Sequence, residues 1–562
     1  MHRFHIPVMG TGFTLDSALR VAKLGIATVI SLADDHLIEK ARLHYASAFG
    51  LPAERIRATD PDARARRITA WLDLVDAVTA RQVEELKALP FQPGNDKWRY
   101  FSLLPDGELR AKFLRLQQLA GAERDAAGRE LTAAIRRGDI DVNVMTKVDG
   151  ATFERDGAPR GPEHTLAKAA VRGFAQSTLA GSLVLSAGVN PSLFGYMEEF
   201  EAFRAPAKKP LIIKVSDFRS AQIQAKTLAR RGLDVREFRI ESGLNCGGHV
   251  FPTDGELMGP ILQAFAEERP KLAAICGHPV RVTAQGGVGT HGEMRRLLET
   301  YGVDSVGWGS PFLLVPEVVL LDEETRRRLE QAGEDELYTS DASPLGVRFT
   351  NLRGSSSEEW SRARVAAGTP GSPCPNKLLA MNTEFGGRPL CTASDDYQKA
   401  KLQQLGFDGT PPWKDAEKIY EKACICDHLG NGLVNALGLS RKQPVAVCPG
   451  PNLAYFGRSY SLEEMVDHIY GRGAPLVPED RPHHFAKELE LYLDAYDALP
   501  RNGPKAERAA EVFRQNLMAG LATLQTLLRG PAFPGENLPS LRAAVQRAAA
   551  RLEPEAPRLA AS

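Results

Sequence analysis

The sequence has no apolar stretch near the roughly 20 residues that a membrane-spanning helix needs, and its N-terminus, MHRFHIPVMG, contains no long apolar run. It also has no net charge, because 70 Lys and Arg residues balance 70 Asp and Glu residues. Without a basic excess there is no electrostatic reason to expect nucleic acid as a partner. A hydrophobic fraction of 43% and a charged fraction of 25% are typical of a soluble globular protein. These features predict a cytoplasmic protein without a membrane span.

Cysteine is scarce, with seven residues in 562. In the cytoplasm these thiols are expected to be reduced. Clustering among them would therefore point to metal or redox chemistry more than to disulfides.

Short apolar segments alternate with helical ones along most of the chain. This alternation predicts an α/β fold, a parallel (β/α)8 TIM barrel over residues 1–325. A helical insertion, broken at prolines and rich in Arg, Glu and Ala, is expected at about 34–138. The eight predicted strands are residues 6–12, 27–32, 141–146, 182–187, 211–215, 237–241, 280–284 and 305–307.

Two glycine-containing turns follow the last two predicted strands. The first is Gly286-Gly287-Val288-Gly289 and the second is Gly309-Ser310. Glycine allows left-handed backbone angles and places no Cβ in the way, so each turn can bring backbone N–H groups close to an anion. Loops after the seventh and eighth strands of such a barrel commonly bind phosphate. The alternative is two ordinary strand-to-helix connections that use glycine.

A parallel barrel carries its chemistry at the C-terminal ends of its strands. The residues expected at those ends are Met9, Gly10, Asn143, Lys214, His249 and Gln285. His249 follows the sixth strand in the run SGLNCGGH, where Gly248 allows close backbone approach. An imidazole can exchange protons near neutral pH, so His249 is the candidate general acid or base, with a structural histidine as the alternative.

The segments GLNCGGH and QGGVGTHGEM…GVDSVGWGSPFLLVPE resemble motifs of the nitronate monooxygenase (2-nitropropane dioxygenase) family of FMN-dependent barrels. That family includes flavin enoyl-ACP reductases and the enoyl reductase component of polyunsaturated fatty acid synthases. The resemblance covers most of residues 1–320 apart from the insertion. It implies that His249 works at the flavin and that Met9 and Gly10 lie against the isoalloxazine ring. The phosphate ligands that it implies are Gly286, Gly287, Gly289, Gly309 and Ser310.

One departure from the family pattern lies directly before the histidine. The family has Glu-Ala or a similar pair before Gly-Gly-His, whereas this chain has Asn245-Cys246. The change alters charge and reactivity next to the flavin, so the choice of substrate does not transfer from the resemblance.

Residues 326–460 form a loop-rich segment that holds five of the seven cysteines. They are Cys374, Cys391, Cys424, Cys426 and Cys448. An iron–sulfur cluster tolerates scattered ligands and is the leading metal interpretation. A structural zinc ion would need tighter paired spacing, and five unrelated buried thiols remain an alternative.

Residues 461–562 are predicted to be helical and show no evident chemistry. Leu517, Leu521, Leu524 and Leu528 share one helix face, which predicts a packing role or a homodimer interface.

Together these features predict an FMN-dependent oxidoreductase. One hypothesis is oxygen-dependent oxidation of a nitronate-like carbanion. A second is NAD(P)H-dependent enoyl reduction in fatty acid or polyketide synthesis, with an acyl thioester or acyl carrier protein as the substrate or partner. A hypothesis from another class is a non-catalytic barrel that binds a phosphorylated metabolite.

Overall fold

The computed structural model describes residues 1–146, 148–154, 158–186, 188–244, 248–250, 252–407 and 416–552. Eight parallel strands close into a barrel in chain order, with β1 paired to both β2 and β8. This confirms the predicted TIM barrel. The strands are β1 (Phe4–Ile6), β2 (Ala27–Ser31), β3 (Ile140–Val144), β4 (Leu183–Leu185), β5 (Leu211–Val215), β6 (Val235–Glu241), β7 (Arg281–Gln285) and β8 (Ser305–Gly307).

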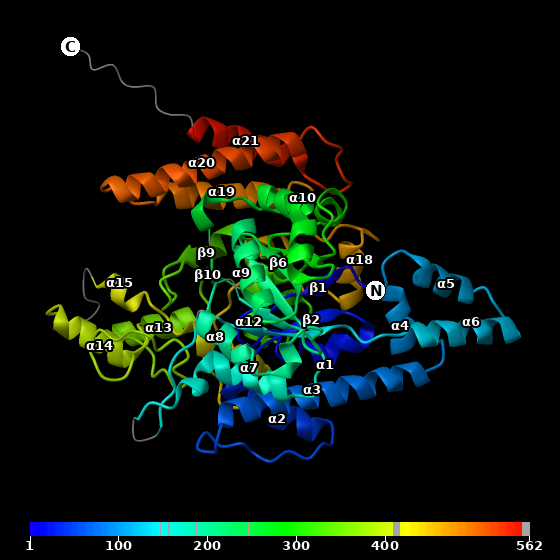
Figure 1. Cartoon of the computed structure of the whole chain (residues 1–562), viewed down its shortest axis with the longest axis horizontal. Helices are drawn as coiled ribbons and strands as arrows, with labels where there is room; N and C mark the ends of the chain where they lie inside the picture. The colour runs from blue at the N-terminus through cyan, green and yellow to red at the C-terminus, as the bar shows by residue number, and fades with distance from the viewer. Residues whose placement is uncertain are drawn as a thin grey trace, which may run out of the picture.

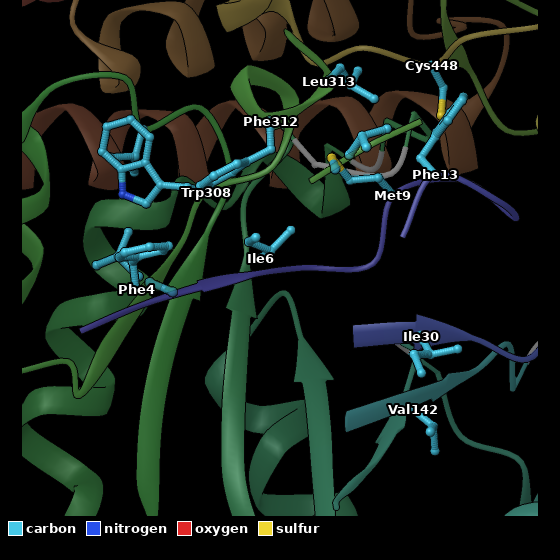
Figure 2. Packing of buried hydrophobic residues seen from close by; sticks show 14 of the residues in the cluster. Phe4, Ile6, Met9, Phe13, Ile30, Val142, Trp308, Phe312, Leu313 and Cys448 are labelled. Carbon is cyan, nitrogen blue, oxygen red and sulfur yellow. The ribbon is translucent and has the colours of Figure 1, made fainter. Parts of the chain in front are cut away.

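The first strand lies earlier in the chain than predicted and shares only Ile6 with the predicted range 6–12. β1 ends at Ile6, and residues 7–12 form a loop at the barrel mouth. Met9 is 1% exposed and packs in this region near Phe13 and Cys448, as Figure 2 shows. Its side chain therefore belongs to the apolar core above β1.

Helices surround the barrel (Figure 1). Those that follow β1 and β3–β7 are α1 (Ser17–Val21), α7 (Leu166–Gln176), α8 (Pro191–Met197), α9 (Phe218–Arg230), α10 (Met258–Cys276) and α11 (His291–Arg295). The strands bury nearly every residue because these helices cover them. Inside the barrel, Val29, Val184 and Ile212 form a small separate apolar cluster.

The expected insertion between β2 and β3 is helical. Its helices are α2 (Asp35–Ala48), α3 (Ala63–Ala88), α4 (Asp96–Leu103), α5 (Glu108–Leu116) and α6 (Gly121–Ala134). α3 packs against α2 and α7, so the first part of this segment belongs to the outer helix layer of the barrel. α4, α5 and α6 extend to one side of the molecule in Figure 1.

The segment after the barrel is mostly irregular, with a small hairpin and short helices. Its elements are α12 (Glu323–Gln331), β9 (Leu337–Ser340), β10 (Phe349–Leu352), α13 (Ser356–Ala366), α14 (Asp395–Gln404), α15 (Glu417–Tyr420), α16 (Ile425–His428) and α17 (Asn431–Ala436). Figure 1 shows α13–α15 on the side opposite α4–α6.

The C-terminal helices are α18 (Leu462–Ile469), α19 (His484–Asp497), α20 (Pro504–Leu527) and α21 (Leu538–Leu552). α19, α20 and α21 pack together, and α20 also packs on α10 of the barrel (Figure 1). Leu517, Leu521 and Leu524 are at most 2% exposed in this layer. The predicted leucine face is therefore covered by the chain itself, which matches the packing role. None of the described helices has both the length and the apolarity needed to cross a membrane.

Candidate functional site at the barrel mouth

A cavity opens at the C-terminal ends of the strands, where barrel enzymes place their sites. It encloses about 1280 Å³, with open solvent at its mouth included. Of the predicted strand-end residues, the cavity wall includes Gly10, Asn143, Lys214 and His249. Met9 and Gln285 are not among its lining residues.

Three side chains at the ends of β5, β6 and β7 form a hydrogen-bonded row. The Lys214 ammonium lies 2.9 Å from Glu241 Oε1, and Gln285 Nε2 donates to the same oxygen at 2.6 Å. Lys214 and Gln285 are buried. Because Glu241 holds both partners, the ammonium is fixed at the cavity wall, where it can donate to a bound ligand.

Two amide oxygens near the mouth have no hydrogen-bond partner in the described structure. They are Asn143 Oδ1 and Gln285 Oε1, on residues that are 4% and 1% exposed. Buried polar atoms are nearly always paired, since leaving one unpaired costs about 1–3 kcal/mol. Asn143 lines the cavity, so its oxygen is available to a donor on a bound molecule.

His249 lies at the cavity with its ring edge-on to Phe349, at a centroid distance of 5.0 Å. Its Nε2 is 2.9 Å from Ser343 Oγ. Burial, with a smaller contribution from the Lys214 charge, lowers the pKa of His249 to about 4. The neutral imidazole therefore faces the cavity at neutral pH. Asn245, Cys246 and Gly247, which precede it, lie outside the described residues.

Two glycines at the barrel mouth lie so close to neighbouring side chains that a Cβ would collide with them. Gly248 has a φ of +83°, and a Cβ there would lie 2.4 Å from Cys448 Cβ. Gly10 has a φ of +54°, and a Cβ would lie 2.9 Å from the Phe13 ring. Both positions let the loops from β1 and β6 pass close to their neighbours, so part of their role is structural.

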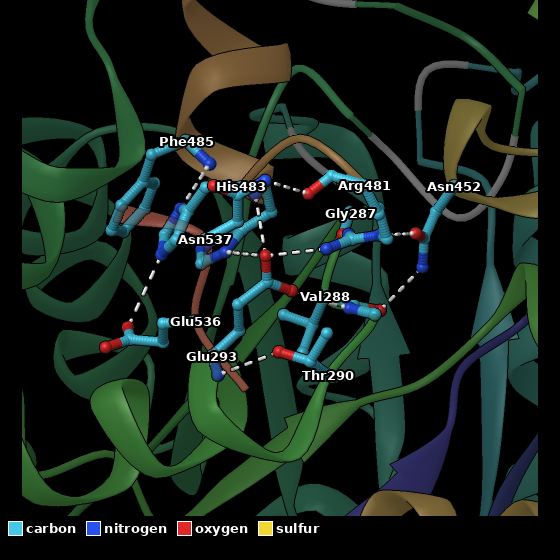
Figure 3. Close-up of polar contacts among 12 residues, drawn as sticks. Gly287, Val288, Thr290, Glu293, Asn452, Arg481, His483, Phe485, Glu536 and Asn537 are labelled. Carbon is cyan, nitrogen blue, oxygen red and sulfur yellow. Dashed lines mark hydrogen bonds and ion pairs between the residues drawn. The ribbon is translucent and has the colours of Figure 1, made fainter. Parts of the chain in front are cut away.

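The first predicted phosphate turn is held by the C-terminal part of the chain. Arg481 donates to Gly287 O at 2.8 Å, Asn452 donates to Val288 O at 2.9 Å, and His468 Nε2 lies 2.9 Å from Gly289 O. Figure 3 shows Arg481 and Asn452 beside the turn. Sequence reasoning missed Arg481 and His468 because they lie more than 150 positions further along the chain and form no local motif.

A carboxylate already lies at one amide of this turn. Glu293 Oε2 accepts a hydrogen bond from Gly289 N–H at 2.8 Å. The residues from Gly287 to Gly292 also have the G-x-G-x-x-G spacing typical of anion-binding turns before a helix. Burial would raise the pKa of Glu293, but the charge of Arg481 and the neighbouring histidines hold it well below its usual range. The anionic side chain therefore occupies part of the predicted phosphate turn.

The second turn contacts the segment that follows Cys448. Ser310 Oγ accepts a hydrogen bond from Gly450 N–H at 2.7 Å. Residues 448–452 thus contact both predicted phosphate turns, since Asn452 binds the first. None of Gly286, Gly287, Gly289, Gly309 and Ser310 is a lining residue of the mouth cavity. Their role as phosphate ligands stays a prediction.

The structure separates the five cysteines of the 326–460 segment into four and one. Cys374, Cys391, Cys424 and Cys426 are buried and influence one another's ionisation. Cys448 is also buried, but it packs against Gly248 and faces the backbone of Gly10 at the barrel mouth. Cys448 is held by the β1 and β6 loops, and the role of the five cysteines as metal ligands stays a prediction.

No protein-family model matches the chain, and no curated protein matches it either. Several solved structures are similar to it. FabK from Thermotoga maritima is 14% identical over 67% of this chain and 85% of its own, with a TM-score of 0.33. The enoyl reductase domain of MlnA from Bacillus amyloliquefaciens is 14% identical over 72% and 89%, with a TM-score of 0.32.

Nitroalkane oxidase from Streptomyces ansochromogenes is 13% identical over 84% of this chain and 94% of its own, with a TM-score of 0.33. At this level of similarity these structures add nothing about chemistry, and the barrel fold rests on the strand pairing described above. An enoyl reductase domain and a nitroalkane oxidase are thus among the proteins to which this chain is similar.

Proposed function

We propose that this chain is an FMN-dependent oxidoreductase whose flavin ring binds in the mouth cavity. The observation that carries the proposal is the unpartnered Asn143 Oδ1 at the cavity wall. A flavin ring carries an N–H donor and carbonyl acceptors along one edge. The Asn143 oxygen suits the donor and the Lys214 ammonium suits an acceptor, so the residues present fit the ring.

The phosphate group is proposed to bind at Gly286, Gly287, Gly309 and Ser310. Arg481 lies beside the first of these turns, where its charge is balanced by that of Glu293. Gly289 contributes less than the family resemblance implies, because its amide already donates to Glu293.

FMN would supply hydride and electron transfer when bound. The protein's own contribution is to hold the ring, exclude water with an apolar wall and place an imidazole beside the substrate. Because its pKa is about 4, His249 is neutral at pH 7 and is a weak base, so its imidazole is best suited to donate a hydrogen bond to the substrate.

The composition of the cavity wall bears on the substrate. Its lining side chains include a largely apolar set: Val144, Met145, Val148, Leu345, Phe349, Leu378 and Leu379. An apolar wall favours an activated alkene carried on an acyl chain, reduced at the expense of NAD(P)H, with an acyl thioester or acyl carrier protein delivering it. Oxidation of a nitronate-like carbanion is the other candidate activity. It is supported by the Lys214 ammonium at the same wall, which can donate a further hydrogen bond to an oxygen of the substrate.

The test begins with the purified protein, which is expected to be yellow and to release FMN on denaturation. Asn143→Leu should weaken FMN binding by about 10-fold, the effect of losing one hydrogen bond to a buried ligand. Asn502→Leu, at an exposed position, is the matched control. A colourless protein that binds no added FMN would contradict the proposal, and retention of another phosphorylated compound would favour a non-catalytic barrel.

Testing different substrates distinguishes enoyl reduction from nitronate oxidation. The flavin should bleach with NADH or NADPH without oxygen, and enoyl thioesters should then restore its colour. Bleaching by nitronates, with no response to either nucleotide, would instead assign nitronate oxidation.

A further inference from the structure

Four buried thiols come together from three segments beside the barrel mouth. Cys374 lies in the loop after α13, Cys391 lies before α14, and Cys424 and Cys426 lie at the start of α16. Their exposed fractions are between 4% and 7%. All four are free thiols. The tertiary structure therefore brings together cysteines that lie up to 52 positions apart in the sequence.

Hydrogen bonds fix the Cys374 segment to the Cys391 segment. Ser372 N–H donates to Ala393 O at 2.9 Å, and Asp395 N–H donates to Ser372 O at 2.9 Å. This pairing lies two residues before Cys374 and two to four residues after Cys391. It fixes the backbone on which both thiols are carried.

Two amide side chains then join the Cys424–Cys426 segment to the other two. Gln398 Nε2 donates to Thr392 O at 3.3 Å and to Lys422 O at 2.9 Å. Asn376 Nδ2 donates to Asp427 Oδ1 at 3.1 Å. Gln398 is fully buried, so breaking this link would leave polar groups unpaired in the interior. The three segments thus hold one another in place.

The thiols form two close pairs. Cys374 hydrogen-bonds to Cys391, and Cys424 hydrogen-bonds to Cys426. Cys426 also lies close enough to Cys374 and Cys391 to interact with both, so the two pairs are neighbours. Cysteine ligates a metal through its deprotonated sulfur.

Backbone N–H groups face three of the sulfur atoms. They belong to Lys377 at Cys374, Ala393 at Cys391 and Asp427 at Cys424. Hydrogen bonds of this kind stabilise anionic sulfur and tune iron–sulfur clusters. The turn that carries the first of them has a strained backbone, because Cys374 has a φ of +49° and Lys377 a φ of +52°.

The array is too open for zinc. Four thiolates at the Zn–S bond length lie about 3.8 Å from one another around the ion, by tetrahedral geometry. Among the described residues, the ligand group with all its atoms within 4.8 Å of one another is Glu293, His483 and His484, and no three of these thiols form such a group. Two close pairs of thiols suit a [2Fe–2S] cluster, in which four cysteines serve two iron atoms.

The array borders the cavity of the candidate site. Cys426 lines the mouth cavity, whereas Cys374 and Cys391 line a second cavity. Arg64, Leu166 and Leu378 belong to the walls of both. The thiols therefore lie between the proposed flavin position and an outer cavity.

We propose that Cys374, Cys391, Cys424 and Cys426 ligate an iron–sulfur cluster at the wall of the mouth cavity. The proposal excludes Cys448 and does not depend on FMN, because the ligands come from a segment outside the barrel strands. The site is built from buried thiols, hydrogen-bond donors to sulfur and three mutually fixed segments.

The experiment is elemental and sulfide analysis of the full chain purified without oxygen. We expect iron and acid-labile sulfide in equal amounts, about two or four of each per chain, together with broad visible absorption. Cys391→Ser and Cys424→Ser should each lower both contents to background. Cys276→Ser and Cys448→Ser should leave them unchanged, since these free thiols lie outside the array.

The wild-type measurement needs no variant, so a variant that fails to fold does not decide the result. FMN content, measured separately after denaturation, distinguishes loss of the cluster from failure of the proposed flavin function. Zinc without sulfide, or neither metal in the anaerobic protein, would overturn the proposal. Loss of iron in Cys448→Ser with retention in Cys424→Ser would overturn the ligand set.

Discussion

Arg481 lies 2.7 Å from the carboxylate of Glu293, and neither side chain is more than 3% exposed. Arg481 lies between α18 and α19, whereas Glu293 lies on α11 directly after the first glycine turn. Arg481 also binds Gly287 O and Asn452, as Figure 3 shows. One buried ion pair therefore connects the C-terminal region to the barrel end that is predicted to bind phosphate.

Replacing Arg481 with Met should destabilise the protein by about 3–5 kcal/mol, because it leaves the Glu293 charge buried without its main partner. The measurement is the free energy of unfolding from urea denaturation. Arg458→Met is the matched control, since Arg458 pairs with Glu464 at the surface and should contribute less than about 1 kcal/mol. Equal effects of the two substitutions would show that the buried pair has no special role.

Glu488 should make stability fall as the pH rises. Burial raises its pKa to about 8, opposed by hydrogen bonds from Met258 and Gly243. The folded protein therefore holds a proton that the unfolded chain releases at about pH 4.5. Between pH 4.5 and 8 the free energy of unfolding consequently falls by up to about 1.4 kcal/mol per pH unit. The nearby Tyr301 and Tyr492 stay neutral there, because burial raises the pKa of both.

Glu488→Gln keeps an oxygen that can accept the Met258 N–H bond but cannot ionise. Urea denaturation at several values between pH 5 and pH 8 should give a flatter stability profile for this variant. An unchanged slope would mean that another group causes the pH dependence.

Two glycine substitutions should separate phosphate binding from backbone strain. Gly287 has a φ of +75°, and a Cβ there would lie 2.5 Å from Leu244 Cδ1. Gly287→Ala should therefore lower both stability and FMN affinity. Gly309 has a φ of −104°, outside the left-handed region. Gly309→Ala should lower FMN affinity at nearly unchanged melting temperature, and unchanged affinity in both variants would contradict the phosphate site.

His249→Ala should leave FMN bound while slowing the half-reaction with substrate by about 10²–10⁴-fold, the usual effect of losing an acid or base. Anaerobic stopped-flow mixing measures this rate, and the flavin spectrum reports cofactor retention. The pKa of His249 is about 4, so this residue does not change its ionisation between pH 5.5 and 8. We therefore expect the rate to be independent of pH in that range. A fully active variant would assign His249 a structural role.

Residues close together in sequence were sufficient to predict the barrel. Several strands are short apolar runs whose side chains are buried, as in Leu211–Val215, which is followed by the helix Phe218–Arg230 with its buried face. That pattern depends on local spacing, so it is visible without the fold. The ends of β3 and β5 were predicted in the same way, and Asn143 and Lys214 do line the mouth cavity.

Contacts between distant segments could not be predicted from local spacing. The sequence places Met9 at a strand end, but only packing against Phe13 turns it into the core. It shows five cysteines in one segment, but only the pairing around Ser372, Gln398 and Asn376 assembles four of them and leaves Cys448 at the barrel mouth. The physical reason is that local sequence sets the periodicity of strands and helices, whereas burial and hydrogen bonding across the whole chain decide which side chains meet.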